Sequence, residues 1–382
     1  MTAFIAIPRD VEHRDRLLAD RRLCDAEFYL IGSPGGNLDA LARMVPVRVN
    51  RIITPDGLYQ KASKPIDPKP EQTRQDLDAA PEVDDICAVT CFFNPLGTVS
   101  LRANYDRFTA ALRAQGVPLV TVECALGDKP HSIQPIDEKL IKVRGRDAMF
   151  LKENLLNIGF KHVPSKFKKI AFLDADMLWA CDTWFRKVSM LLDHYMAVQV
   201  FSDIFHLGRD GRVMHHGPSE AKRRAKHMTG WGAPGAGWAV HRSTLEACGG
   251  IFEHCVVGAG DMIHTHLGFY GDMNHSWTRQ MSPEIREAAQ DWAKTMHSIV
   301  RSKCTWIDTR MSHLFHGSRQ KRQYTERHSL IKDAGLNWLR KNDDGVFEWS
   351  EKAPSSIKSA MRQYFLARDE DEGIELTKST IR

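Results

Sequence analysis

Three apolar runs, each closed by a polar residue, alternate with helical patterns and restrict the folds open to this chain. In order, the runs and patterns occupy 86–93, a helix with Tyr105, Phe108 and Leu112 on one face, 117–123, about 148–159, and 170–173. Strands that alternate with helices form a parallel sheet with helices on both faces. The sequence therefore predicts an α/β, Rossmann-like fold with a mostly parallel central sheet.

A polar side chain stands at the end of each apolar run. Asn94 follows the first run, Glu123 ends the second, and Asp174 follows the third. In open α/β sheets, ligands bind at the carboxyl ends of the strands. These three residues are therefore the first candidates for a binding site.

The chain divides into four predicted segments. Residues 1–58 hold two short apolar runs around a polar helical stretch and predict a small N-terminal α/β appendage. Residues 59–85 are rich in Lys, Pro, Asp and Gln, which is typical of a linker or exposed loop. Residues 86–350 carry the strand–helix alternation and all the motifs below. Residues 351–382 predict a last helix over 355–367 and a mobile tail.

Composition excludes several classes of protein. With 42% hydrophobic and 26% charged residues, the chain is neither fibrous nor mostly disordered. No uninterrupted apolar stretch approaches the length of a spanning helix, so we expect no membrane partner. The first residues lack a basic leader and a long apolar stretch, so we expect no signal peptide. The eight cysteines are scattered without a CxxC pair, which favours a reducing cytoplasm over a disulfide framework.

The sharpest local motif is the Asp-x-Asp sequence that follows the third run. Asp174 and Asp176 come directly after Phe172-Leu173 and place two carboxylates at the ligand edge of the sheet. Hard oxygen ligands of this kind suit Mg²⁺ or Mn²⁺ bridging a diphosphate. Alone, the tripeptide fits an ordinary surface turn equally well, so its context decides.

That context is a series of ordered sequence blocks between about residues 86 and 348. The blocks are Val89–Pro95, Asn104-Tyr105, Leu151–Asn157, Leu173–Asp176, Gly235–Val240, Gly249-Gly250, Gly258–Asp261, His316–Arg319 and Arg322–Tyr324. In this series the chain resembles nucleotide-sugar glycosyltransferases of the glycosyltransferase-A fold, and is most similar to a poorly characterised bacterial and phage branch. The resemblance implies a metal-dependent transfer of a sugar from a nucleoside diphosphate to an acceptor hydroxyl.

The resemblance also implies a metal and donor site. Asp176 matches the acid that binds the metal, Asp174 matches a contact to the ribose or the ion, and His316 matches a third ligand; a nitrogen ligand favours Mn²⁺ over Mg²⁺. Without the resemblance, His316 is a buried histidine between Phe315 and Gly317. The expected donor contacts are Asn94 and Glu123 to ribose and uracil, which points to a UDP-sugar, and Arg319, Lys321 and Arg322 to the diphosphate. Lys152 and Asp174 complete the expected donor site.

Asp261 is the candidate general base. Inverting members of this fold hold an acid here to deprotonate the acceptor hydroxyl. The alternative is that Asp261 caps a short helix. His264, three residues later, would share its helical face. Members of the family that have a second acid read Glu-Asp or Asp-Asp where this chain has Gly260-Asp261.

The acceptor side is predicted around residues 209–238. Between residues 209 and 227, six Lys/Arg stand against two acids, and between 310 and 328 five stand against one. Such clusters suit an anionic partner or are solvated surface loops. The predicted acceptor contacts are Trp231, Trp238, His264, Arg223 and Arg224, where an indole stacks on a sugar or a base or is simply core.

The branch that the chain resembles occurs in phage genomes, where such enzymes glycosylate hydroxymethylated pyrimidines in DNA. The leading prediction is therefore glycosyl transfer to a hydroxymethylpyrimidine in double-stranded DNA, in a bacterial or phage-infected cytoplasm. A polysaccharide or surface-glycan acceptor is the rival. A sugar nucleotidyltransferase and a non-catalytic DNA- or glycan-binding module remain alternatives from other classes.

Overall fold

The computed structural model describes residues 83–134, 139–318, 320–323 and 326–372 in full, and four N-terminal strands at the level of the backbone. Those strands are β1 (Ala3–Ala6), β2 (Glu27–Leu30), β3 (Val49–Thr54) and β4 (Gly57–Gln60), which form one sheet in the order β2-β1-β3-β4. β1 pairs in parallel with β2 and β3, and β4 pairs antiparallel with β3. The helical stretch predicted between β1 and β2 lies outside the described residues.

The main body is built on a seven-stranded sheet in the order β14-β10-β13-β8-β5-β6-β7. Its strands are β5 (Ile86–Phe93), β6 (Leu119–Leu126), β7 (Lys139–Gly145), β8 (Lys169–Leu173), β10 (Ala197–Gln199), β13 (Gly237–His241) and β14 (Cys304–Trp306). Only β13 runs against the others, since it pairs antiparallel with both β8 and β10. The predicted α/β fold with a mostly parallel central sheet is confirmed.

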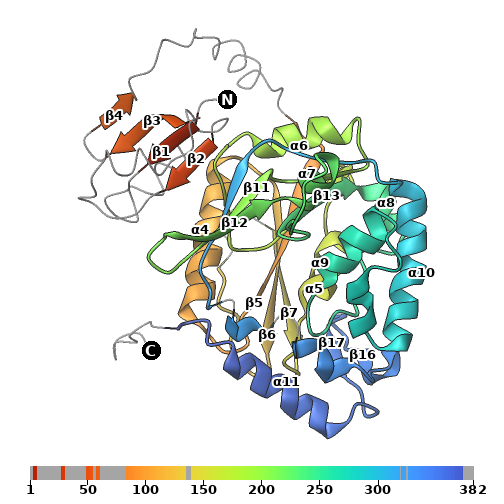
Figure 1. Ribbon diagram of the computed structural model, residues 1–382. Helices are drawn as coiled ribbons and strands as arrows, with labels where there is room; N and C mark the ends of the chain where they lie inside the picture. The colour runs from red at the N-terminus through yellow and green to blue at the C-terminus, as the bar shows by residue number, and fades with distance from the viewer. Residues whose placement is uncertain are drawn as a thin grey trace.

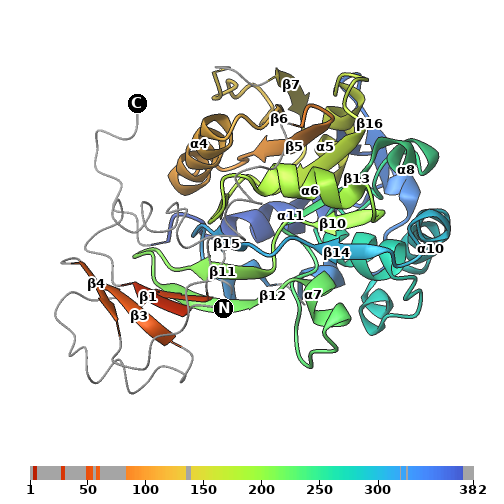
Figure 2. The same ribbon diagram turned by 90° about the horizontal axis from the view of Figure 1, so that it is seen from above.

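Helices cover both faces of this sheet, as Figures 1 and 2 show. They are α4 (Val99–Ala114), α5 (Lys152–Lys161), α6 (Trp184–Leu192), α7 (Glu220–Ala225), α8 (Arg242–Ala247), α9 (Gly260–Met262), a π-helix (Ile263–Phe269), α10 (Pro283–Val300) and α11 (Ser355–Ala367). Alternation along β5 explains the layering, because successive strand residues point to opposite faces. Ile86 and Ala88 pack with α4 and α6, whereas Cys87 and Val89 pack with α5.

A second, four-stranded sheet has the order β12-β11-β15-β9, and its strand β9 begins shortly after the end of β8 in the main sheet. Its strands are β9 (Met177–Trp179), β11 (Asp203–Leu207), β12 (Val213–Pro218) and β15 (Arg310–His313). A two-stranded ribbon of β16 (Leu339–Lys341) and β17 (Phe347–Trp349) follows late in the chain. α11 has the bounds expected from the sequence, and its Phe365 packs edge-on against Phe93 at the end of β5. Among the described helices, none has the length and apolar character needed to cross a bilayer.

Candidate active site

Three side chains converge next to the end of β8. The Nε2 atom of His316 lies 2.9 Å from Oδ2 of Asp176, and Nε2 of His313 lies 3.8 Å from the same oxygen. One ligand-type atom from each of the three residues lies within 4.8 Å of the other two. The cluster forms because β9, directly after Asp176, pairs antiparallel with β15, which ends at His313. The backbone N–H of Leu314 then donates to the carbonyl of Asp176 and fixes the two segments together.

The ligand atoms that this cluster offers fit a divalent transition metal. Two imidazoles and one carboxylate suit Mn²⁺ better than Mg²⁺, which prefers oxygen ligands alone. Within the described residues, no group donates a hydrogen bond to the buried Oδ1 of Asp176, which is unusual for a buried carboxylate oxygen. Burial alone would raise the pKa of Asp176, but the neighbouring His313 and His316 hold it well below its usual range. The carboxylate is therefore ionised and ready to ligate.

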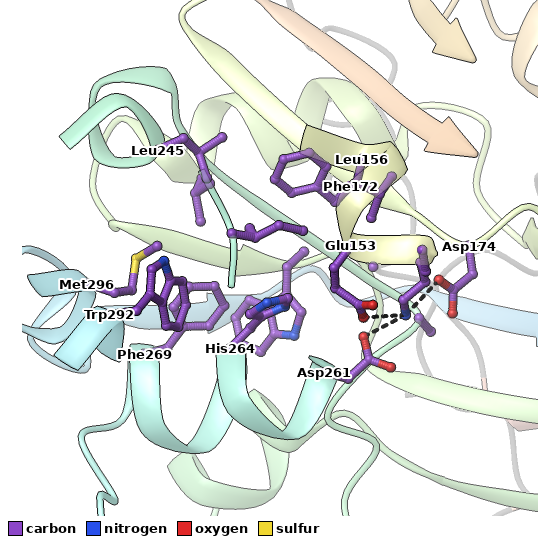
Figure 3. Close-up of a pocket in the computed structure, with 16 residues that line it drawn as sticks. Glu153, Leu156, Phe172, Asp174, Leu245, Asp261, His264, Phe269, Trp292 and Met296 are labelled. Atoms are coloured by element: carbon purple, nitrogen blue, oxygen red, sulfur yellow. Dashed lines mark hydrogen bonds and ion pairs between the residues drawn. The ribbon is translucent and has the colours of Figure 1, made fainter. Parts of the chain in front are cut away.

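Asp174 lies apart from this cluster and contacts a lysine. Its Oδ1 accepts a hydrogen bond from the Lys152 ammonium at 3.1 Å, and the same ammonium donates to Oδ1 of Asp261 at 2.8 Å. Glu153 completes the group, with its Oε1 3.9 Å from the Lys152 nitrogen. Figure 3 shows the carboxylates of Glu153, Asp174 and Asp261 directed toward one another. One lysine thus holds three carboxylates at the start of α5, and the predicted metal role of Asp174 remains a prediction.

The backbone around Asp261 is shaped to admit its side chain. Ala259 has a left-handed φ of 71°, a conformation that costs energy for a residue with a Cβ and that recurs at functional sites. Gly235 lies so close to the Asp261 carboxylate that an added Cβ would overlap it, and Gly260 stands in the same relation to Glu153. Asp261 does not cap α9, whose N-cap is Ala259. Burial would raise the pKa of Asp261, but Lys152 outweighs this effect and the pKa is lowered.

Asp176, His313 and His316 form what we call the metal-type cluster, because they could hold a metal ion. One cleft is lined both by this cluster and by Asp261. It has a volume of about 270 Å³, and Asp176, His313, His316, Lys152 and Asp261 all line it. Its remaining wall includes aromatic and charged side chains from the end of β5, the segment before α5, two short helices around residues 320–331, and the end of α11 with the residues after it. Among them are Phe92, Phe93, Phe150, Arg322, Arg327, Phe365, Arg368 and Glu370. The cluster that could hold a metal ion and the candidate base therefore line the same cleft.

The residues predicted to bind the sugar donor differ in where their side chains lie. Arg322 lines the cleft, and Lys321 instead pairs at the surface with Asp369 at 2.6 Å and Glu372 at 3.1 Å. Arg319 lies outside the described residues. The carboxylate of Glu123 accepts hydrogen bonds from the backbone of Ser132 and Ile133 and is 2% exposed.

The side chain of Asn94 likewise forms its hydrogen bonds within its own loop. Its side-chain carbonyl accepts from the backbone N–H of Thr98 at 2.8 Å, and its amide donates to the Thr98 carbonyl at 2.7 Å. These bonds order the turn before α4. Asn94 and Glu123 therefore have clear structural roles, and contacts from them to a nucleotide remain a prediction.

The predicted acceptor residues are spread over core and surface. The Trp238 indole is buried, donates to the Pro234 carbonyl at 2.8 Å and packs on Phe269. His264 lies at 3.0 Å from the Phe252 carbonyl, and burial lowers its pKa to about 4. Both line a small apolar cavity behind Asp261, where Figure 3 shows His264 beside Trp292. Trp231 is 43% exposed.

Arg223 and Arg224 both turn toward one buried carboxylate. Each lies 2.6 Å from Oε1 of Glu220, which is 1% exposed. Arg224 also stacks over Tyr270 at 4.3 Å and bonds to Nδ1 of His266 at 2.9 Å. Arg224 thereby connects α7 to His266 and Tyr270, and the single Glu220 carboxylate balances one of the two arginine charges.

Sequence reasoning missed His313, Glu153 and the end of α11. His313 stands three residues before His316, and that spacing is a signal that a search for paired histidines would have found. Glu153 stands next to Lys152 in a block already singled out. Glu370, whose Oε1 lies 3.9 Å from Nδ1 of His316, sits in an acidic run that is ordinary at the level of sequence.

Glu153 provides a pH-dependent test of this cluster. Burial raises its pKa to about 7, because the charged form loses water and gains too little from Lys152. Its contribution to stability is therefore full below its ordinary pKa near 4.5 and is lost as the pH rises through about 7. A shift of this size corresponds to about 3 kcal/mol. Urea unfolding at acidic and mildly alkaline pH should show the wild type losing this stability relative to Glu153→Gln. The exposed Glu246→Gln serves as the control, and parallel pH curves for wild type and Glu153→Gln would refute the assignment.

Comparisons with known proteins give distant structural likenesses only. The sequence matches no model of a known protein family, and no curated protein matches it. A mutant of Drosophila β-1,4-galactosyltransferase 7 in complex with manganese, UDP-Gal and xylobiose aligns at 15% identity and a TM-score of 0.29, over 48% of this chain and 60% of that one. GalNAc-T7 with UDP, GalNAc and Mn²⁺ aligns at 13% identity and 0.36, over 60% and 43%.

A putative glucose-1-phosphate thymidylyltransferase from Bacillus anthracis, in complex with a sucrose, aligns at 7% identity and a TM-score of 0.30, over 68% of this chain and 98% of that one. This chain spans less than two thirds of the two sugar transferases named above. With TM-scores below 0.5, these likenesses establish neither a family nor an activity.

Proposed function

We propose that this chain is a metal-dependent glycosyltransferase of the glycosyltransferase-A fold, with a nucleoside-diphosphate sugar as donor. The observation that carries the proposal is the single cleft lined by both Asp261 and the cluster of Asp176, His313 and His316. An ion site and a base in one cleft are what sugar transfer from a diphosphate requires, because the leaving group and the nucleophile each need a partner.

The residues have distinct roles in the proposed reaction. Asp176, His313 and His316 would hold a Mn²⁺ ion, which when bound neutralises charge on the departing diphosphate. Arg322 lines the cleft and would pair with phosphate oxygens. Lys152 keeps Asp261 ionised at neutral pH, so that its carboxylate is able to accept a proton.

The proposed chemistry is a single displacement with inversion. The acceptor oxygen forms a bond to the anomeric carbon, while the bond from that carbon to the diphosphate oxygen breaks. The acceptor proton passes to the Asp261 carboxylate, and the nucleoside diphosphate leaves. We propose UDP-sugars as donors and residues 86–350 as the catalytic domain, to which α11 and its C-cap add Phe365 and Arg368 at the cleft.

The acceptor predicted from the sequence is a hydroxymethylpyrimidine in DNA. Its support is the exposed Trp231, since an indole can stack on an extruded base. The neighbouring basic stretch supports it less than its composition indicates, because four of its six cations pair with carboxylates. The pairs are Arg212–Asp210, Lys222–Asp203, Arg223–Glu220 and Arg224–Glu220.

A donor screen tests the proposed function. The full chain is incubated with single nucleotide sugars and Mn²⁺, with and without candidate acceptors that include hydroxymethylcytosine DNA, and release of nucleoside diphosphate is measured. We expect release from one UDP-sugar that chelation of the metal abolishes. Release of pyrophosphate from a nucleoside triphosphate and a sugar phosphate would instead identify a nucleotidyltransferase. Absence of turnover with every donor and acceptor would refute the proposal.

A further inference from the structure

A row of imidazole rings crosses the second sheet and begins at the metal-type cluster. His215 on β12 pairs directly with His206 on β11, and His206 pairs directly with His313 on β15. Directly paired residues of neighbouring strands lie on the same face of a sheet. Their ring centroids are 5.6 Å apart for His206 and His215 and 4.7 Å apart for His206 and His313. His313 then stacks on His316 at 5.1 Å.

The outer end of this row is an exposed indole. Trp231 lies 5.3 Å from the ring of His215 and 6.4 Å from that of His206, measured between centroids. Its ring also covers Gly217 on β12, where an added Cβ would approach it to 2.9 Å. The indole therefore packs against the sheet, and 43% of the residue still faces solvent. A large aromatic side chain fixed in this way has little rotamer entropy left to lose on binding.

The position of Trp231 relates this surface to the candidate base. Trp231 stands four residues before Gly235, which lies against the Asp261 carboxylate. Four residues span at most about 14 Å when fully extended. The indole and the Asp261 carboxylate are therefore close enough for one ligand to contact both. A short oligosaccharide, with one ring on the indole and its terminal hydroxyl at Asp261, is a ligand of that kind.

Charge distinguishes between the macromolecules that aromatic rings bind. A nucleic acid needs cations along its path, because phosphate contacts dominate its affinity. On the neighbouring helix α7, Arg223 and Arg224 point to Glu220, and Lys222 lies 2.6 Å from Asp203. Two carboxylates balance two of these three cations, so the rings beside Trp231 stand next to a helix with one uncompensated positive charge. A neutral ring with apolar C–H faces suits such a surface better than a phosphodiester does.

We propose that Trp231, His215 and His206 form a distal acceptor subsite for a neutral oligosaccharide, whose terminal sugar then reaches Asp261. The subsite rests on the proposed function, since it names the acceptor class of that same cleft. One sugar ring stacks on the Trp231 indole, the His215 and His206 rings extend the platform toward the metal-type cluster, and the terminal hydroxyl enters the cleft. The protein accordingly prefers oligosaccharide acceptors over the corresponding monosaccharides.

Direct binding tests the subsite without relying on turnover. The full chain is titrated calorimetrically with xylo-, cello- and maltohexaose and with the three monosaccharides, and by fluorescence anisotropy with a short hydroxymethylcytosine duplex. We expect at least one hexaose to bind more tightly than its monosaccharide. Trp231→Ala should weaken that binding about tenfold, and Trp231→Phe should restore part of it. Met214→Ala is the matched control. Met214 is 73% exposed and lies next to His215 on β12, so its side chain is on the opposite face of that strand.

Each outcome separates this inference from the proposed function. If none of the three hexaoses binds through Trp231, or if Trp231→Ala weakens binding of the duplex instead, the oligosaccharide subsite is wrong even when the chain releases UDP from a UDP-sugar. If a hexaose binds through Trp231 while no nucleotide sugar turns over, Trp231 belongs to a glycan-binding site, and the glycosyltransferase function and the acceptor role of that site are both wrong. Mn²⁺-dependent affinity for UDP, measured in parallel, should be the same in wild type and Met214→Ala.

Discussion

Replacing Asp261 by Asn is expected to reduce sugar transfer by about 10²- to 10⁴-fold, the range that loss of a general base typically costs. The amide retains the shape of the carboxylate and still accepts a hydrogen bond from Lys152, but it takes no proton from the acceptor hydroxyl. Affinity for UDP and Mn²⁺ should change little, because the ion-site residues are untouched. Single-turnover rates, with donor affinity measured by calorimetry, separate the two effects.

Two further variants test whether the loss of transfer is specific to the Asp261 carboxylate. The exposed Asp308→Asn makes the same chemical change away from the cleft and should transfer sugar at the wild-type rate. Gly235→Ala does not substitute Asp261, but the added Cβ would overlap the Asp261 carboxylate, so that side chain must move. We expect that variant to lose transfer as well. Unchanged transfer by Asp261→Asn would remove Asp261 as the base and direct attention to Glu153.

The elements of the fold were predictable from local patterns. The apolar runs that became β5, β6 and β8 are long enough to be buried on both faces, and the 3.6-residue spacing of Tyr105, Phe108 and Leu112 placed α4. Asp176 and His316 were paired through an ordered series of motifs. Their pairing is correct in space, since 2.9 Å separates them.

The remaining features of the site depend on contacts between distant segments, which local periodicity does not encode. His313 joins the cluster only because β15 pairs with β9 in one register, and a shift by one residue would turn its ring to the other face. Lys152 reaches Asp174 and Asp261 from the first turn of α5, and no spacing in the sequence relates these three positions.

Polar residues at strand ends show a second limit of sequence-based prediction, because a residue expected to bind a ligand can have a structural role instead. Asn94 and Glu123 stand where ligand contacts are expected, yet their side chains already bond to the backbone of neighbouring loops. A buried polar group needs a partner whether or not a ligand is present. From sequence alone, a carboxylate that orders a loop and one that binds a nucleotide look the same.

Removal of any one imidazole or carboxylate of the cluster is expected to abolish Mn²⁺-dependent turnover at ordinary metal concentrations. Loss of a supporting contact to a ligand already costs about 10- to 100-fold in metal affinity, so loss of a ligand should cost more. We expect His313→Ala, His316→Ala and Asp176→Ala each to exceed that range, and the exposed His194→Ala to bind Mn²⁺ like the wild type.

Asp174→Asn decides between two arrangements of the metal site. The sequence motif groups Asp174 with Asp176 as ligands, whereas the structure pairs Asp174 with Lys152 and groups Asp176 with His313 and His316. Electron paramagnetic resonance of free Mn²⁺ gives the affinity of each variant directly, without any need for turnover. If the histidines complete the site, Asp174→Asn should retain Mn²⁺ affinity within about tenfold of the wild type, because only a neighbouring charge is lost. If instead it loses as much affinity as Asp176→Ala while His313→Ala loses none, then Asp174 is a ligand and His313 is not. Lys152 would then have to release Asp174 when the metal binds.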